Sequence, residues 1–70
     1  MTIGQRAAKL IKERSWAEGT SFEQQCNKID CSDRYMWNWS SGKNNPSASV
    51  LAEMLRAGYD IEYILLGESK

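Results

Sequence analysis

The sequence predicts an all-α fold built from five short helices. Apolar residues recur three and four positions apart in each segment, as they do on one face of a helix. Serine or aspartate, which cap helix N-termini, precedes several of these segments, and glycine, which ends helices, follows others. No segment shows an apolar–polar alternation that would require a β-strand.

The first helix is expected from about Ile3 to Arg14 or Trp16, with Gly19 beyond it as a left-handed cap. Trp16 is expected to fill the core in place of the apolar residue that Thr20 does not provide. The residues at helical spacing that form the buried face are Ile3, Ala7, Leu10 and Ile11.

The second helix is expected over Phe22–Lys28. Ser21 is its N-cap, and Gln24 three positions later has the spacing of a capping box. The inward stripe is Phe22, Cys26 and Ile29, whereas Gln25 places an amide where a wide apolar stripe would favour leucine.

The third helix is expected from about Asp33 to Ser40, capped by Ser32. Met36 and Trp39 lie three positions apart and are expected to point into the core. That arrangement leaves Trp37 largely exposed, an unusual place for a large aromatic side chain. The other residues on the outer face or its N-terminal edge are Asp33, Arg34, Tyr35 and Asn38.

A loop from Ser41 to Pro46 follows, in which Gly42 supplies the turn. Ser47 is expected to cap a fourth helix, from about Ala48 to Ala57. The residues of this helix expected to face inward are Val50, Leu51, Met54 and Leu55.

The last helix is expected over Ile61–Leu66, with Asp60 as its cap and Gly67 at its end. Residues 1–67 therefore form one domain, and residues 68–70 form a short tail. The apolar residues of this last helix, together with Tyr59, exceed what a short terminal helix needs for its own packing. They either close the core or supply a dimer contact.

The composition describes an ordinary globular chain of 70 residues that carries no net charge. Residues 1–45 have a net charge of +2 and residues 46–70 a net charge of −2, so one face is expected to be weakly basic. No apolar run is long enough to span a membrane, and no signal-peptide pattern is present, which favours the cytoplasm. Cys26 and Cys31 are expected to be reduced core residues.

The absence of histidine, of a metal-ligand cluster and of a nucleophile beside a base argues against an enzyme. No cofactor, metal or small-molecule substrate is expected. A capped helix that ends in a polar loop bearing Lys43 suits a negatively charged partner instead.

The arrangement resembles the lambda-repressor-like helix-turn-helix domains of the Cro, phage-repressor and XRE-type family. The resemblance is carried by Ile3–Arg6, by Ser21, by the turn Ile29–Ser32, by Met36 and Trp39, by the loop Ser41–Ser47 and by Gly58–Gly67. Many members of the family pair an arginine late in the first helix with a glutamate just after the tryptophan. Here those two positions hold Ile11 and Ser40.

The resemblance implies that the second and third helices form the helix-turn-helix and that the third enters the DNA major groove. The base-reading candidates are then Asp33, Arg34, Tyr35, Trp37 and Asn38. The phosphate-contact candidates are Ser21, Phe22, Ser32, Ser41, Lys43, Asn44 and Asn45.

The leading hypothesis is therefore a sequence-specific transcriptional regulator of phage or prophage repressor type. Its partner would be double-stranded operator DNA, bound by a homodimer formed through the C-terminal helix. The alternative hypothesis is a protein-interaction module that keeps the fold without binding DNA. Zero net charge and the aromatic pair Tyr35 and Trp37 favour that alternative.

Overall fold

A computed structural model describes residues 1–29, 31 and 34–68, apart from the side chain of Tyr35. The described chain forms five helices and no strand, which confirms the all-α prediction. None of its helices is both long and apolar enough to cross a membrane. The helices are α1 (Ile3–Glu18), α2 (Phe22–Lys28), α3 (Arg34–Ser40), α4 (Ala48–Arg56) and α5 (Ile61–Leu66).

The first two helices begin with capping boxes. Ser21 Oγ accepts from the Gln24 N–H at 3.1 Å while the Ser21 N–H donates to Gln24 Oε1 at 2.8 Å, as predicted. Thr2 and Gln5 make the same reciprocal pair at the start of α1, which the sequence analysis did not identify. α1 continues to Glu18, beyond its expected end, and Gly19 caps it with a φ of 67°.

The caps of the last two helices also match the predictions. Ser47 Oγ accepts from the Val50 N–H at 3.3 Å at the start of α4. Asp60 Oδ1 accepts from the Tyr63 N–H at 3.0 Å at the start of α5, which ends at Gly67. These bonds satisfy backbone donors that a helix cannot satisfy by itself.

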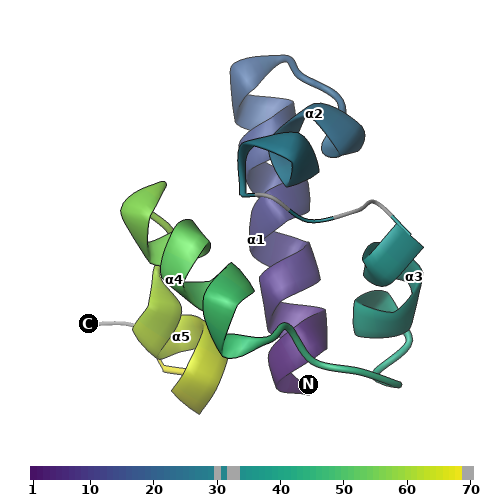
Figure 1. Ribbon diagram of the computed structural model, residues 1–70, viewed down its shortest axis with the longest axis vertical. Helices are drawn as coiled ribbons and strands as arrows, with labels where there is room; N and C mark the ends of the chain where they lie inside the picture. The colour runs from purple at the N-terminus through teal and green to yellow at the C-terminus, as the bar shows by residue number, and fades with distance from the viewer. Residues whose placement is uncertain (30, 32–33, 69–70) are drawn as a thin grey trace.

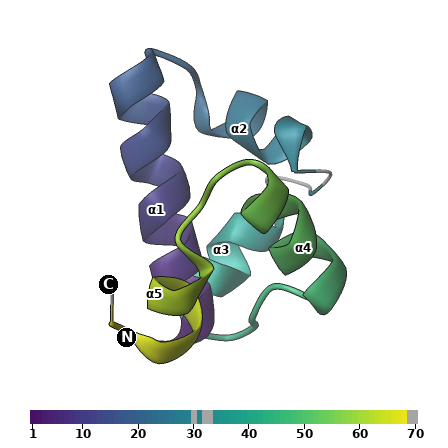
Figure 2. The ribbon, with the colours of Figure 1, turned by 90° about the vertical axis from the view of Figure 1, so that its left-hand side faces the viewer.

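The other helices are arranged around α1 (Figure 1). α2 lies near the C-terminal end of α1, and α3 lies beside its N-terminal half, while α4 and α5 are on the opposite side from α3. Figure 2 shows α5 close to the start of α1. Among the described helices, α2, α3 and α5 approach α1 most closely, while α4 lies against α5 and places Met54 in the same core.

The buried face of α1 consists mainly of small residues. Gly4, Ala7, Ala8 and Ser15 are buried there, together with Ile11. These residues allow the other helices to approach closely, and a Cβ on Gly4 would collide with the Asn44 carbonyl oxygen. The rest of the core comes from Cys26, Ile29, Cys31, Met36, Trp39, Met54, Tyr59 and Ile64.

Two predictions about side-chain orientation are wrong. Trp16 does not fill the core, because 77% of its surface is exposed on the outer side of α1. Leu55 also points outward, with an exposed fraction of 62%. Met54 is buried as predicted, Tyr59 is buried as well, and both cysteines are core residues, as expected.

A polar network takes the place of the leucine expected at position 25. Gln25 is buried, and its Nε2 donates to Glu18 Oε1 at 2.8 Å and to Thr20 Oγ1 at 2.7 Å. The Tyr59 hydroxyl donates to Gln25 Oε1 at 3.5 Å. A buried amide with these partners is tolerated in the core, and it ties α2 to the turn after α1.

Two arginines of α1 bind carbonyl groups of the C-terminal half. Arg6 Nε donates to the Ile64 carbonyl at 2.8 Å, near the end of α5. Arg14 Nη1 donates to the Ala57 carbonyl at 2.6 Å, and its guanidinium lies 3.7 Å from the centroid of the Tyr59 ring. Both arginines therefore stabilise helix ends that would otherwise leave carbonyls without partners.

We predict that Gly4→Ala destabilises the fold by about 1–3 kcal/mol, because the added methyl group forces α1 away from the loop after α3. Chemical denaturation measures the loss, and NMR shifts locate the change near Trp39 and Asn44. Gly19→Ala is the control, since its Cβ would meet nothing within 4 Å and only its positive φ is strained. Equal disturbance around Trp39 in both variants would contradict the packing argument.

The hydrogen bond from Gln25 is the largest single cause that lowers the pKa of Glu18 from its ordinary value of 4.5, and Lys28 lowers this pKa further through its charge and a hydrogen bond. A lowered pKa stabilises the fold above pH 4.5, and this contribution is lost as the pH falls through the folded-state value. We expect Gln25→Leu to raise the pKa of Glu18 and to reduce the acid sensitivity of folding. Carbon NMR of the carboxyl group measures the pKa, and Lys28→Met, which leaves the Gln25 bond in place, should leave the pKa below its ordinary value. An unchanged value in Gln25→Leu would disprove the assigned cause.

Candidate nucleic-acid interface

The side chains of α3 divide into a buried face and an outer face, as the sequence predicts. Met36 and Trp39 are buried against α1, and only 2% of the Trp39 surface is exposed. Trp37 is 82% exposed, while Arg34 is exposed and Asn38 is half-buried. The outer face of α3 thus presents a guanidinium, an indole and an amide-bearing residue to a partner.

The loop after α3 is organised by one carbonyl group. The Asn38 carbonyl accepts from the Lys43 N–H at 2.9 Å, the Asn44 N–H at 3.2 Å and the Ser41 hydroxyl at 3.1 Å. Gly42, with a φ of 80°, lets the chain turn back over the end of the helix. The side chains of Lys43 and Asn44 are left exposed beside α3, where the sequence analysis placed phosphate contacts.

Two other phosphate candidates have internal partners. Asn45 Oδ1 accepts from the Gly4 N–H at 2.9 Å, so this side chain fastens the loop to the start of α1. Ser21 uses its hydroxyl and its N–H in the capping box of α2. Glu23 adds a carboxylate to the first turn of that helix, which opposes a phosphate there.

Some candidates lie outside the described residues. Ser32 and Asp33 belong to this group, and so does the side chain of Tyr35. The turn residue Asp30 lies outside them as well. The described part of the candidate site therefore consists of Arg34, Trp37, Asn38 and the loop that follows.

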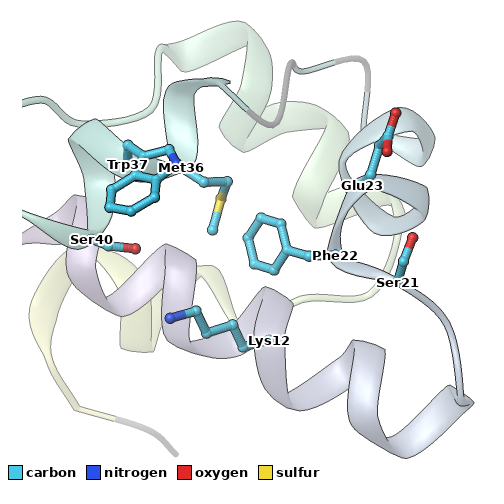
Figure 3. Close-up of a pocket in the computed structure, with 7 residues that line it drawn as sticks. All are labelled: Lys12, Ser21, Phe22, Glu23, Met36, Trp37 and Ser40. Atoms are coloured by element: carbon cyan, nitrogen blue, oxygen red, sulfur yellow. The ribbon is translucent and has the colours of Figure 1, made fainter.

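A cleft of about 470 Å³ opens between α2 and α3 above α1. Figure 3 shows Phe22 and Met36 turned toward each other across it, with Trp37 and Ser40 on the α3 side. The Lys12 side chain extends from α1 beneath these residues, with its ammonium group toward the Ser40 end. The sequence analysis missed Lys12, because its position in the first helix gave no sign that it borders α3.

Most cations of the described chain already have partners. Arg6 and Arg14 bind carbonyl groups, and Lys9 donates to the Tyr63 hydroxyl at 3.2 Å. Lys28 and Arg56 form surface salt bridges with glutamates, at 3.5 and 2.7 Å. Among the side chains that the structure describes, those of Lys12 and Lys43 make no such bond. Both lie next to α3, which concentrates available positive charge there.

Comparison with known proteins adds no family to this description. No family model, no curated protein and no solved structure matches the chain. The resemblance to repressor domains therefore stays a prediction from the residues themselves.

The two tryptophans of α3 provide a direct test of its orientation. We expect Trp37→Ala to change the free energy of unfolding by less than about 0.5 kcal/mol, because the ring is exposed. Trp39→Ala should cost about 3–5 kcal/mol, which approaches the whole stability of so small a domain. Thermal unfolding followed by circular dichroism measures both. A large loss for Trp37→Ala would mean that its ring packs on the fold.

Proposed function

We propose that this chain is a sequence-specific DNA-binding transcriptional regulator of phage or prophage repressor type. The observation that carries the proposal is the presence of two available lysines next to α3. Lys12 and Lys43 make no bond within the described chain, and Arg34 is exposed at the start of the helix. An exposed helix with flanking lysines suits the major groove and the phosphates on either side of it.

In this proposal α3 enters the major groove, and each of its outer side chains makes a different contact with the DNA. Arg34 binds a guanine through O6 and N7, and Asn38 offers its amide to an adenine. Trp37 packs its exposed ring against a thymine methyl group or sugar edges. Lys43 and Asn44 contact phosphates after the helix, and Lys12 joins them from α1. Ser41, which donates its hydroxyl to the Asn38 carbonyl, can only add to these contacts by accepting a hydrogen bond through water.

The electrostatic part of the affinity should be modest. The chain has no net charge, and Glu23 lies near the same surface. Each neutralised phosphate contributes roughly −0.9 to the slope of log K against log salt, so a few lysines give a shallow slope. Sequence-specific contacts from α3 must then supply a larger share of the binding free energy.

A homodimer through the C-terminal helix remains part of the proposal. Ile64 is buried in the core, but Leu65 and Leu66 at the end of α5 are exposed. Exposed leucines of this kind favour contact with a second copy, and a two-fold dimer would place two α3 helices on paired half-sites.

The second candidate function is that of a protein-interaction module. It is favoured by the exposure of two tryptophans, Trp16 on α1 and Trp37 on α3. Trp37 borders the cleft between α2 and α3, and Trp16 borders a neighbouring hollow. Lys12 and Ser40 line both. Exposed aromatic residues are enriched at protein interfaces, so loss of DNA binding with retention of this surface would give such a module.

An amide-resolved NMR titration with a mixed-sequence duplex tests the first function against the second. We expect shifts in α3 and in Ser41–Asn44 at low salt that weaken as salt rises. With a site selected from a random pool, Arg34→Ala should cost about 1–3 kcal/mol and relax specificity at one base pair. Lys43→Ala should weaken all duplexes alike and lower the salt slope by about 1.

Lys28→Ala is the matched control, because Lys28 already pairs with Glu18. Its salt slope should equal that of the parent protein. The absence of shifts at low salt would refute DNA binding and favour the protein-interaction function. An Arg34→Ala variant with unchanged specificity would remove the role given to that side chain.

A further inference from the structure

The cleft between α2 and α3 has the size of a small-molecule site. Its volume of about 470 Å³ falls within the roughly 300–1,000 Å³ typical of ligand pockets. It lies outside the outer face of α3 that the proposed DNA contact uses, but it shares Trp37 with that face. Both α2 and α3, the two helices of the proposed helix-turn-helix, contribute walls to it (Figure 3).

The walls are apolar and suit a flat ring. The Phe22 ring and the Met36 thioether face each other in Figure 3, and the Trp37 indole borders the cleft on the α3 side. Thioether and aromatic groups both pack favourably on an aromatic ligand. Because Trp37 is 82% exposed, a ring placed against it would also remove much indole surface from water.

The polar groups of the cleft select the charge of the ligand. Lys12 places an ammonium group near Ser40, and its side chain makes no hydrogen bond or ion pair within the described residues. The Glu23 carboxylate lies at the far end, beyond the Phe22 ring from Lys12 (Figure 3). The end next to Lys12 is therefore complementary to an anion, while the middle is complementary to an apolar ring.

We propose that this cleft binds a small aromatic carboxylate, with its ring between Phe22, Met36 and Trp37 and its carboxylate on Lys12. A second step rests on the proposed DNA-binding function. One ammonium group cannot serve both a ligand carboxylate and a DNA phosphate, and a ring against Trp37 covers a side chain given to the groove. The ligand therefore opposes DNA binding.

Titration with 1-naphthylacetate and with its neutral amide, 1-naphthylacetamide, tests the site. The indole N–H signals of Trp16, Trp37 and Trp39 are assigned with single Trp→Phe variants. We expect 1-naphthylacetate to shift the Trp37 signal and the amides of Phe22 and Met36 saturably, while Trp16 in the neighbouring hollow stays unchanged. The carboxylate should bind more tightly than the amide.

Lys12→Met removes the charge and keeps the length of the side chain. It should weaken the carboxylate by about two- to fivefold, the range of an exposed ion pair, and leave the amide unaffected. Lys43→Met, outside the cleft, is the control and should keep the preference. Equal binding of both probes, shifts centred on Trp16, or no saturable shift would each overturn the proposed site.

Dilution of the protein without a probe tests a competing occupant. Concentration-dependent shifts of Trp37, Phe22 and Met36 would show that a second copy fills the cleft, which would also overturn the proposal. Unchanged signals across the dilution support it.

Competition with DNA is measured separately. At ten times its own Kd, 1-naphthylacetate should weaken DNA binding by about tenfold, as expected for mutually exclusive ligands. Unchanged DNA affinity with the cleft filled would refute the competition. A chain that binds the probe but no DNA would refute the proposed function and leave the ligand site standing.

Discussion

The close approach of the other helices to α1 is the constraint on which the structure depends. A chain of 70 residues can bury only a small core, so each contact must be short. Gly4, Ala7 and Ala8 remove side-chain bulk along α1, and Ile11 supplies a large apolar side chain at its centre. With Gly4 against the Asn44 carbonyl, the helix and the loop after α3 meet backbone to backbone, which fixes the position of α3.

This packing also determines where charge is available. α1 carries Arg6 and Arg14 toward the ends of α5 and α4, where their guanidinium groups bind carbonyl oxygens. These cations hold the C-terminal half in place and are withdrawn from any partner. The lysines that remain available are Lys12, which lines the cleft with Ser40, and Lys43, in the loop that follows α3. A chain without net charge thereby acquires a locally basic surface next to an exposed helix.

The helices and their caps could be predicted because local chemistry decides them. Ser21, Ser47 and Asp60 satisfy backbone donors within their own first turns, so a short stretch of sequence contains the whole interaction. Trp16 and Leu55 could not be placed in this way, because helical periodicity gives a face but not its neighbours. Trp16 is exposed because none of the described helices covers its side of α1. Gln25 is buried with hydrogen bonds to Glu18 at the end of α1 and to Thr20 in the turn that follows.

The candidate site was only partly predictable for a related reason. Periodicity placed Trp37 outside and Trp39 inside, but Lys12 joins α3 only through tertiary packing. Ser40 of α3 borders both the cleft and the neighbouring hollow together with Lys12 of α1, so the two residues are neighbours in space although they are far apart in the sequence. Ile11, the residue before Lys12, is buried, so the same turn of α1 supplies a core side chain on one face and an available lysine beside α3 on the other.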